Sequence, residues 1–244
     1  PSDDVTLMAM AMFNNKEMHL DTYKGMMGRE FLGSFDTSTS DLGSVSLTAL
    51  RKLYQTPQHR AHLHLGITKG MGKNDDSGQV LTPMNMRVSM TLPYAMQSSD
   101  QSTRLIAGIT NVSSFGDFWV GNQLMFNTAV AEEDWSLGNR WDLNSWVQRP
   151  LNEYFSYSAR LHFSTEKAIN GRSLMIMAPV QTANPDNYGG QKIDFAVGMN
   201  AVANFFGGEN HRLGFEVVLP IKQNKRGLQM NDDYTLVLGY KKML

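Results

Sequence analysis

The feature that most constrains this chain is a strict two-residue alternation of apolar and polar side chains. It is clearest in residues 152–165, NEYFSYSARLHFST. One face of this segment carries Phe155, Tyr157, Ala159, Leu161 and Phe163. The other carries Tyr154, Ser156, Ser158, Arg160, His162 and Ser164. Because successive side chains of a β-strand point to opposite faces, the pattern predicts a strand with one apolar and one polar face.

The same alternation recurs along most of the chain, and no segment has the periodicity of a long amphipathic helix. We predict ten strands, at about 4–16, 44–55, 59–69, 103–113, 117–131, 139–149, 152–165, 190–204, 210–222 and 233–244. The sequence therefore predicts an all-β, antiparallel fold. The pattern alone does not decide whether the apolar faces form the core of a soluble sandwich or meet lipid.

The lengths of the connections favour lipid. Long connections near 17–43, 70–102 and 166–189 alternate with short ones such as TPQ, SFG and RPL. Long extracellular loops alternating with tight periplasmic turns are typical of outer-membrane barrels. The last strand carries an apolar face toward Leu244, and aromatic residues such as Trp119 and Trp135 near strand ends suggest interfacial girdles. We predict one domain, residues 1–244, forming an up-and-down transmembrane β-barrel.

Composition excludes other classes. The formal net charge is −1, which argues against binding nucleic acid through bulk charge. The chain has no cysteine, hence no disulfide framework and no thiolate metal site. No run approaches the roughly 20 apolar residues of a membrane-spanning helix. The N-terminus, PSDDVTLMAM, does not read as an intact signal peptide.

Four stretches resemble one family of Gram-negative outer-membrane barrels. They are VTLMAM at 5–10, LPYAMQ at 92–97, NPDNYGGQKIDFAVGMN at 184–200 and HRLGFEVVLPIKQNKRGLQMNDDYTLVLGY at 211–240. The family comprises the transporter-like proteins grouped with the phenol meta-degradation pathway proteins. The resemblance implies an outer-membrane location and uptake of small organic, including aromatic, molecules. Members begin with a further strand or two and end on an aromatic residue, so the resemblance predicts ten strands here, or twelve if an N-terminal hairpin is missing.

The charged residues on the polar faces predict what a barrel interior would contain. The residues expected to line a lumen are Lys52, Arg104, Arg140, Asp142, Arg160, His162, Lys192, Asp194, Arg212 and Glu216. Cations outnumber acids in this set, which favours a narrow, porin-like channel with a mild anion preference. The alternative is that these residues pair into a structural network that plugs the barrel.

A second candidate site is a soft-metal site. Met8, Met10 and Met12 share one strand face, and His62 and His64 share another. Thioether and imidazole groups suit Cu(I), so copper is the predicted metal. The alternative is an apolar strip along the path of an organic solute.

Two further classes remain. Catalysis is not expected: Ser156, Ser158 and Ser164 share a face with His162, but side chains two residues apart on a strand lie about 7 Å apart. The chain also lacks a GxSxG motif. A structural or partner-binding envelope barrel, with its contacts in the long loops, is the alternative to transport.

Overall fold

The computed structural model describes residues 4–25, 28–177, 180–202 and 211–242. Ten strands form one antiparallel sheet in which strands that follow each other along the chain lie side by side. The strands are β1 (Val5–Tyr23), β2 (Phe31–Gln55), β3 (His59–Gly70), β6 (Thr103–Phe115), β7 (Phe118–Ala131), β9 (Arg140–Pro150), β10 (Phe155–Glu166), β12 (Gly190–Val202), β13 (His211–Lys225) and β14 (Thr235–Lys242). The prediction of an all-β, antiparallel fold is confirmed.

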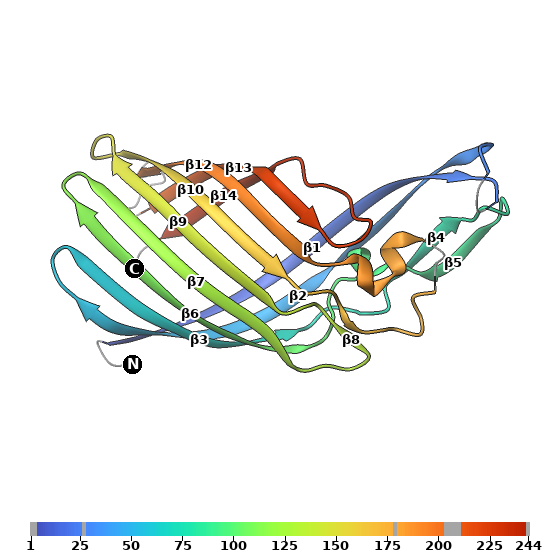
Figure 1. The fold of residues 1–244 in the computed structure, drawn as a ribbon, viewed down its shortest axis with the longest axis horizontal. Helices are drawn as coiled ribbons and strands as arrows, with labels where there is room; N and C mark the ends of the chain where they lie inside the picture. The colour runs from blue at the N-terminus through green and yellow to red at the C-terminus, as the bar shows by residue number, and fades with distance from the viewer. Residues whose placement is uncertain (1–3, 26–27, 178–179, 203–210, 243–244) are drawn as a thin grey trace.

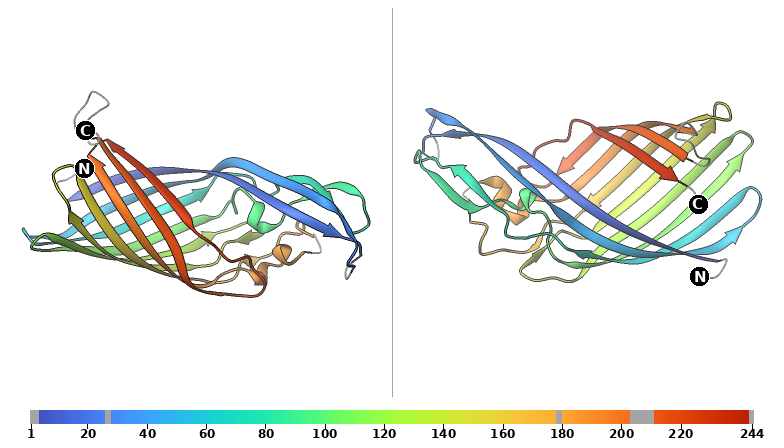
Figure 2. Two further views of the ribbon diagram at one scale, coloured as in Figure 1. Left: turned by 90° about the horizontal axis from the view of Figure 1, so that it is seen from above. Right: turned by 180° about the vertical axis from the view of Figure 1, so that it is seen from behind.

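The sheet curls into a half-barrel (Figures 1 and 2). Within the described residues, β1 and β14 each pair with one neighbour only, so they are the two edges of the sheet. The turns at 56–58, 116–117 and 151–154 lie at one end, the turn end. The connections 71–102, 132–139 and 226–234, with the described residues 167–177 and 180–189, lie at the other, the loop end.

The orientation of the two faces is the reverse of that in a soluble sheet. On β3, His64 is 8% exposed, whereas its apolar neighbour Leu65 is 55% exposed. On β12, Asp194 is 3% exposed and Phe195 38%. The polar side chains therefore lie on the concave face, and the apolar side chains cover the convex face. Trp119 lines the concave side and Trp135 is buried among loops, so neither belongs to the expected girdles.

The predicted loop at 17–43 is wrong. β1 and β2 continue through most of it as a long hairpin, paired from Val5↔Arg51 to Tyr23↔Phe31 with a bulge beside Met12. The Ser- and Thr-rich segment near residue 37 reads as a loop by composition. Its alternation nevertheless buries Thr37 and Thr39 on one face, and β-branched threonine is favoured in strands. The predicted strand ends at 203–204, 210 and 243–244, including Leu244, lie outside the described residues.

The loop end carries small elements of its own. β4 (Ser77–Leu81) and β5 (Arg87–Thr91) form a hairpin, and β8 (Trp135–Ser136) pairs with β11 (Asn170–Gly171). The described residues include the 3-10 helices η1 (Tyr94–Met96), η2 (Gln181–Ala183) and η3 (Pro185–Asn187). In the described part of the chain, no helix has the length and apolar character needed to cross a membrane.

These loops pack into a cap with a small apolar core of Tyr94, Trp135, Ile169 and Ile176. The rings of Tyr94 and Trp135 meet edge to face, with centroids 4.8 Å apart. We call this cluster and the segments that carry it the loop cap.

Hydrogen bonds tie the loop cap to the concave face of the sheet. Lys16 Nζ of β1 donates to the carbonyl oxygens of Ala95 (3.1 Å) and Gln97 (2.5 Å). Thr39 Oγ1 of β2 donates to Met96 O at 2.8 Å. The cap thus covers the loop end of the concavity.

Candidate functional site

The concave face carries a chain of ionic contacts across three neighbouring strands. Arg140 of β9 contacts both oxygens of Asp142, at 2.9 Å and 3.0 Å. His162 of β10 places Nε2 2.8 Å from Asp142 Oδ1 and Nδ1 3.3 Å from Asp194 Oδ2 of β12. Lys192 Nζ lies 3.4 Å from the same Asp194 oxygen. Strand register produces this chain, because His162 stands directly opposite Asp194.

A second ion pair lies closer to the turn end. Arg160 of β10 contacts Glu216 of β13 through Nε at 3.2 Å and also through Nη2, and it donates from Nη1 to Asn144 of β9 at 2.8 Å. Gly198 of β12 lies between the two strands in register with Glu216, so no side chain blocks the contact. The side chain of Arg160 therefore links β10 to β9 on one side and, across β12, to β13 on the other.

Arg104 joins the sheet to the loop cap. Its Nη1 and Nη2 donate to the carbonyl oxygens of Leu137 (2.8 Å) and Gly138 (2.9 Å), and Nη1 lies 3.5 Å from Asp100. Asp100 also accepts from Leu137 N at 2.9 Å. This arginine was predicted to line a lumen, and the structure places it in contacts that hold the cap.

The ten residues predicted to line a lumen are thus mostly paired. Lys52 contacts Asp4 at 2.6 Å. Among the described residues, Arg212 is the one member of the set for which no ion pair is found. The predicted excess of cations is therefore concentrated at Arg212, near the turn end of β13.

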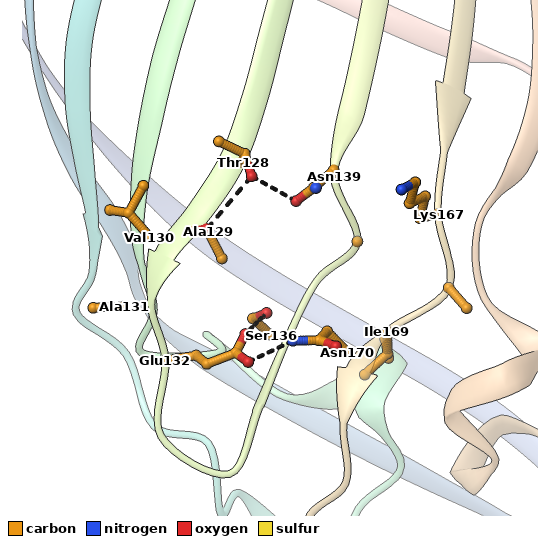
Figure 3. A pocket seen from close by; sticks show the side chains of 12 residues that line it. Thr128, Ala129, Val130, Ala131, Glu132, Ser136, Asn139, Lys167, Ile169 and Asn170 are labelled. Atoms are coloured by element: carbon orange, nitrogen blue, oxygen red, sulfur yellow. Dashed lines mark hydrogen bonds between the residues drawn. The ribbon is translucent and has the colours of Figure 1, made fainter.

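A cavity of about 450 Å³ lies at the loop end between β7 and the 167–170 segment. Figure 3 shows its polar groups already engaged with one another. Glu132 accepts from Ser136 and Asn170, and Thr128 Oγ1 donates to Asn139 Oδ1 at 2.7 Å. The single acid of this cavity is held by its neighbours and is not poised to act on a ligand.

A larger cavity, of about 840 Å³, lies on the concave face at the turn end, and we call it the turn-end pocket. Its walls come from eight strands of the sheet, β3, β6, β7, β9, β10, β12, β13 and β14. They include Arg60, Trp119, Trp146, Gln148, Arg212 and Lys241. The guanidinium of Arg60 lies over the Trp119 ring, 5.0 Å from its centroid.

Sequence reasoning missed part of this pocket. Arg60 has the same parity as His62 and His64 in RAHLHLGIT, and that signal could have placed it on the concave face. Trp146 has the same parity as Arg140, Asp142 and Gln148 in RWDLNSWVQ, so the same signal could have placed it on the concave face. The room for its ring depends on Gly121 of the neighbouring strand, which parity does not reveal. A Cβ at Gly121 would lie 2.0 Å from the indole of Trp146, so the glycine makes room for the ring.

The predicted copper ligands form two separate groups. The rings of His62 and His64 have centroids 4.6 Å apart, and His64 Nε2 lies 2.8 Å from Thr110 Oγ1. Met8 pairs with Thr48 of β2, and Thr48 in turn pairs with Gly66 of the strand that carries the histidines. Two strand spacings, about 10 Å, therefore separate the strand of Met8, Met10 and Met12 from that of the histidines.

That separation is too large for one coordination sphere of methionine and histidine. In the part of the chain that is described, no group of three or more His, Cys, Asp or Glu side chains is arranged to hold a metal ion. The copper hypothesis stays a prediction.

Comparison with known proteins adds no family assignment. No protein-family model matches the sequence, and no curated protein matches it. The resemblance to the transporter-like outer-membrane barrels therefore stays a prediction.

Proposed function

We propose that this protein is an outer-membrane β-barrel of a Gram-negative bacterium that passes small solutes along its polar concave face. The observation that carries the proposal is the reversed orientation of the sheet: apolar side chains are exposed on the convex face and charged side chains are enclosed on the concave face. Lipid-facing apolar residues alternating with polar interior residues are the defining pattern of such barrels.

The energetics of the convex face support a lipid environment. Its exposed residues include Leu47, Leu65, Ile67, Leu143, Leu161, Phe195, Val197 and Leu219. Contiguous apolar patches beyond a few hundred Å² are rare on soluble monomers, and each Å² left in water costs about 25 cal/mol. Hydrocarbon removes that cost. A spanning strand needs about 9–11 residues, and β9 and β10 have 11 and 12.

In a bilayer the sheet must also close into a barrel. Hydrocarbon cannot satisfy the free backbone groups of a sheet edge, so the edges β1 and β14 require partners in a bilayer. Direct pairing would give a ten-strand barrel, and two further strands between them would give twelve. Barrels of this size lie between side-chain-filled eight-strand barrels and open porins, which suits a narrow path.

A second candidate function is a non-conducting envelope barrel with a structural or partner-binding role. The specific observation in its favour is that the loop cap and the ion pairs occupy the concavity at the loop end and at mid-height. If the protein transports solutes, the loop cap must move, or a passage for the solute must remain beside it.

Single-channel recording in a planar bilayer separates the two. The purified protein, folded in detergent micelles, is added to one chamber, and insertion is measured independently by protection from protease in vesicles of the same lipid. Steady conductance steps support transport. A protein that inserts and is protected yet gives no steps contradicts transport and favours the structural role.

A further inference from the structure

The turn-end pocket places cationic side chains beside aromatic ones and has few acids to balance their charge. Its described lining residues include three arginine or lysine side chains, Arg60, Arg212 and Lys241, and one acid, Glu153. Closer to the loop end, Arg140, Arg160 and Lys192 on the same face are each paired with a carboxylate, as Arg160 is with Glu216. The pocket therefore carries an excess of positive charge.

Two of these cations are held beside each other. Arg212 of β13 and Lys241 of β14 are directly opposite in the register of the two strands. Like charges in directly opposed positions destabilise a sheet. Within the described residues neither has an ion-pair partner, so the arrangement is unfavourable until an anion occupies the space between them.

The opposite wall supplies flat apolar surface. Arg60 stacks on Trp119, which fixes the guanidinium on the ring and leaves its N–H groups available in the pocket. Trp146 stands on the adjacent strand, in the space that Gly121 leaves free. Gln148 and Asn200 add amide groups to the lining. A planar ring fits such a wall, while its charged substituent faces the cations.

We propose that the turn-end pocket binds small aromatic carboxylates, with the ring against Trp119 and Trp146 and the carboxylate between Arg60 and the Arg212–Lys241 pair. This assignment names a solute class for the proposed transport function. The role of the pocket as a binding site along the solute path rests on that function. A carboxylate accepts two N–H groups of a guanidinium side by side, a geometry that lysine alone does not provide. A cavity of about 840 Å³ exceeds the size of a single substituted benzene ring, so binding leaves room for exchange.

The test is equilibrium binding to the folded protein in detergent micelles, measured by calorimetry with three probes. Benzoate has the ring and the charge, benzyl alcohol has the ring alone, and inorganic phosphate has the charge alone. The proposal expects benzoate to bind at least tenfold more tightly than either. Phosphate binding as tightly as benzoate would reduce the pocket to a general anion site, or one for lipid phosphate, and overturn the proposal; no saturable benzoate binding would do the same.

Variants locate the site. Arg212→Gln and Arg60→Gln should each weaken benzoate binding at least fivefold, whereas Arg87→Gln, an exposed arginine on β5, should leave it unchanged. Equal affinities in all three variants would refute the assignment. The probe comparison needs no variant, so a variant that fails to fold leaves the test intact.

These readouts are independent of conductance. Benzoate binding in a protein that gives no conductance steps would keep the site and refute transport, whereas conductance without binding would do the reverse.

Discussion

Arg160 of β10 reaches past β12 to Glu216 of β13, and the two side chains form an ion pair on the concave face of the sheet. Both are about three-quarters buried, with side-chain exposures of 26% and 22%. Desolvated charges that face each other in this way depend on each other, because either one alone would be left buried without a counter-ion.

Arg160→Ala should therefore destabilise the folded protein. Exposed pairs contribute under about 1 kcal/mol and breaking fully buried pairs costs about 3–5 kcal/mol, so about 2 kcal/mol is expected for this incompletely buried pair. Urea-induced unfolding in micelles measures it. In a double-mutant cycle, Arg160→Ala with Glu216→Ala should cost less than the sum of the single changes. Strict additivity would mean that the two side chains do not interact.

Ion selectivity should depend on Arg212 more than on Arg160. Because Glu216 compensates the charge of Arg160, the double variant Arg160→Gln with Glu216→Gln keeps the net charge of the concave face and should leave the reversal potential nearly unchanged. Arg212→Gln removes a charge that no described acid balances and should shift the reversal potential toward cations. An equal shift in both proteins would contradict the assignment of the uncompensated charge.

The loop cap should limit conductance. Trp135→Ala removes the largest side chain of the cap core, a change that costs about 3–5 kcal/mol of local packing in comparable sites. The cap should loosen and the conductance should rise. Trp141→Ala on the convex face, where the indole is 45% exposed, is the matched control and should leave the conductance as it was. A conductance that Trp135→Ala leaves unchanged would place the constriction elsewhere.

The cap should also respond to alkaline pH through Tyr188. Its hydroxyl donates to Thr182 O at 2.6 Å and accepts from Ala95 N at 3.0 Å. Burial raises the pKa of Tyr188 from 10 to about 12. A raised pKa means that the folded state favours the neutral phenol, so its stabilisation is complete below pH 10 and is lost as the pH rises toward 12.

Protease sensitivity of the 167–189 segment should accordingly increase between pH 10 and pH 12. In Tyr188→Phe the hydroxyl is absent, so cleavage should be faster already at pH 8 and its pH dependence in that range should shrink. An unchanged profile in the variant would assign the alkaline transition to another group.

Most of the strands could be predicted from the sequence, because the alternation of apolar and polar residues is a pattern within each segment. Each of the ten predicted segments overlaps a strand of the large sheet, and RAHLHLGIT already separates Leu63 and Leu65 from His62 and His64. Alternation did not reveal how far a strand extends beyond its most regular segment, as in the long hairpin of β1 and β2. The Ser- and Thr-rich region near residue 37 has the composition of a loop and the pairing of a strand.

The candidate site was less predictable, because its contacts are made between strands. Parity alone put Asp142, His162 and Asp194 on one face, but only the register brings them into a single chain of contacts. Likewise, the space that holds Trp146 is set by Gly121 on a neighbouring strand. The cap contacts of Arg104 depend on the fold of the loops, whose residues show no periodic pattern from which that fold could be predicted.

The central claim is that the convex face meets lipid, and adjacent residues of β2 test it most directly. Leu47 is 59% exposed on the convex face, whereas its neighbour Ser46 is half-buried on the concave face. The measurement is the free energy of folding into lipid vesicles for Leu47→Lys and Ser46→Lys.

A lysine facing the bilayer midplane costs about 2–4 kcal/mol, so Leu47→Lys should lose that amount and Ser46→Lys clearly less. The opposite order, with Leu47→Lys tolerated and Ser46→Lys disruptive, would mean that the convex face meets water, and it would contradict the account.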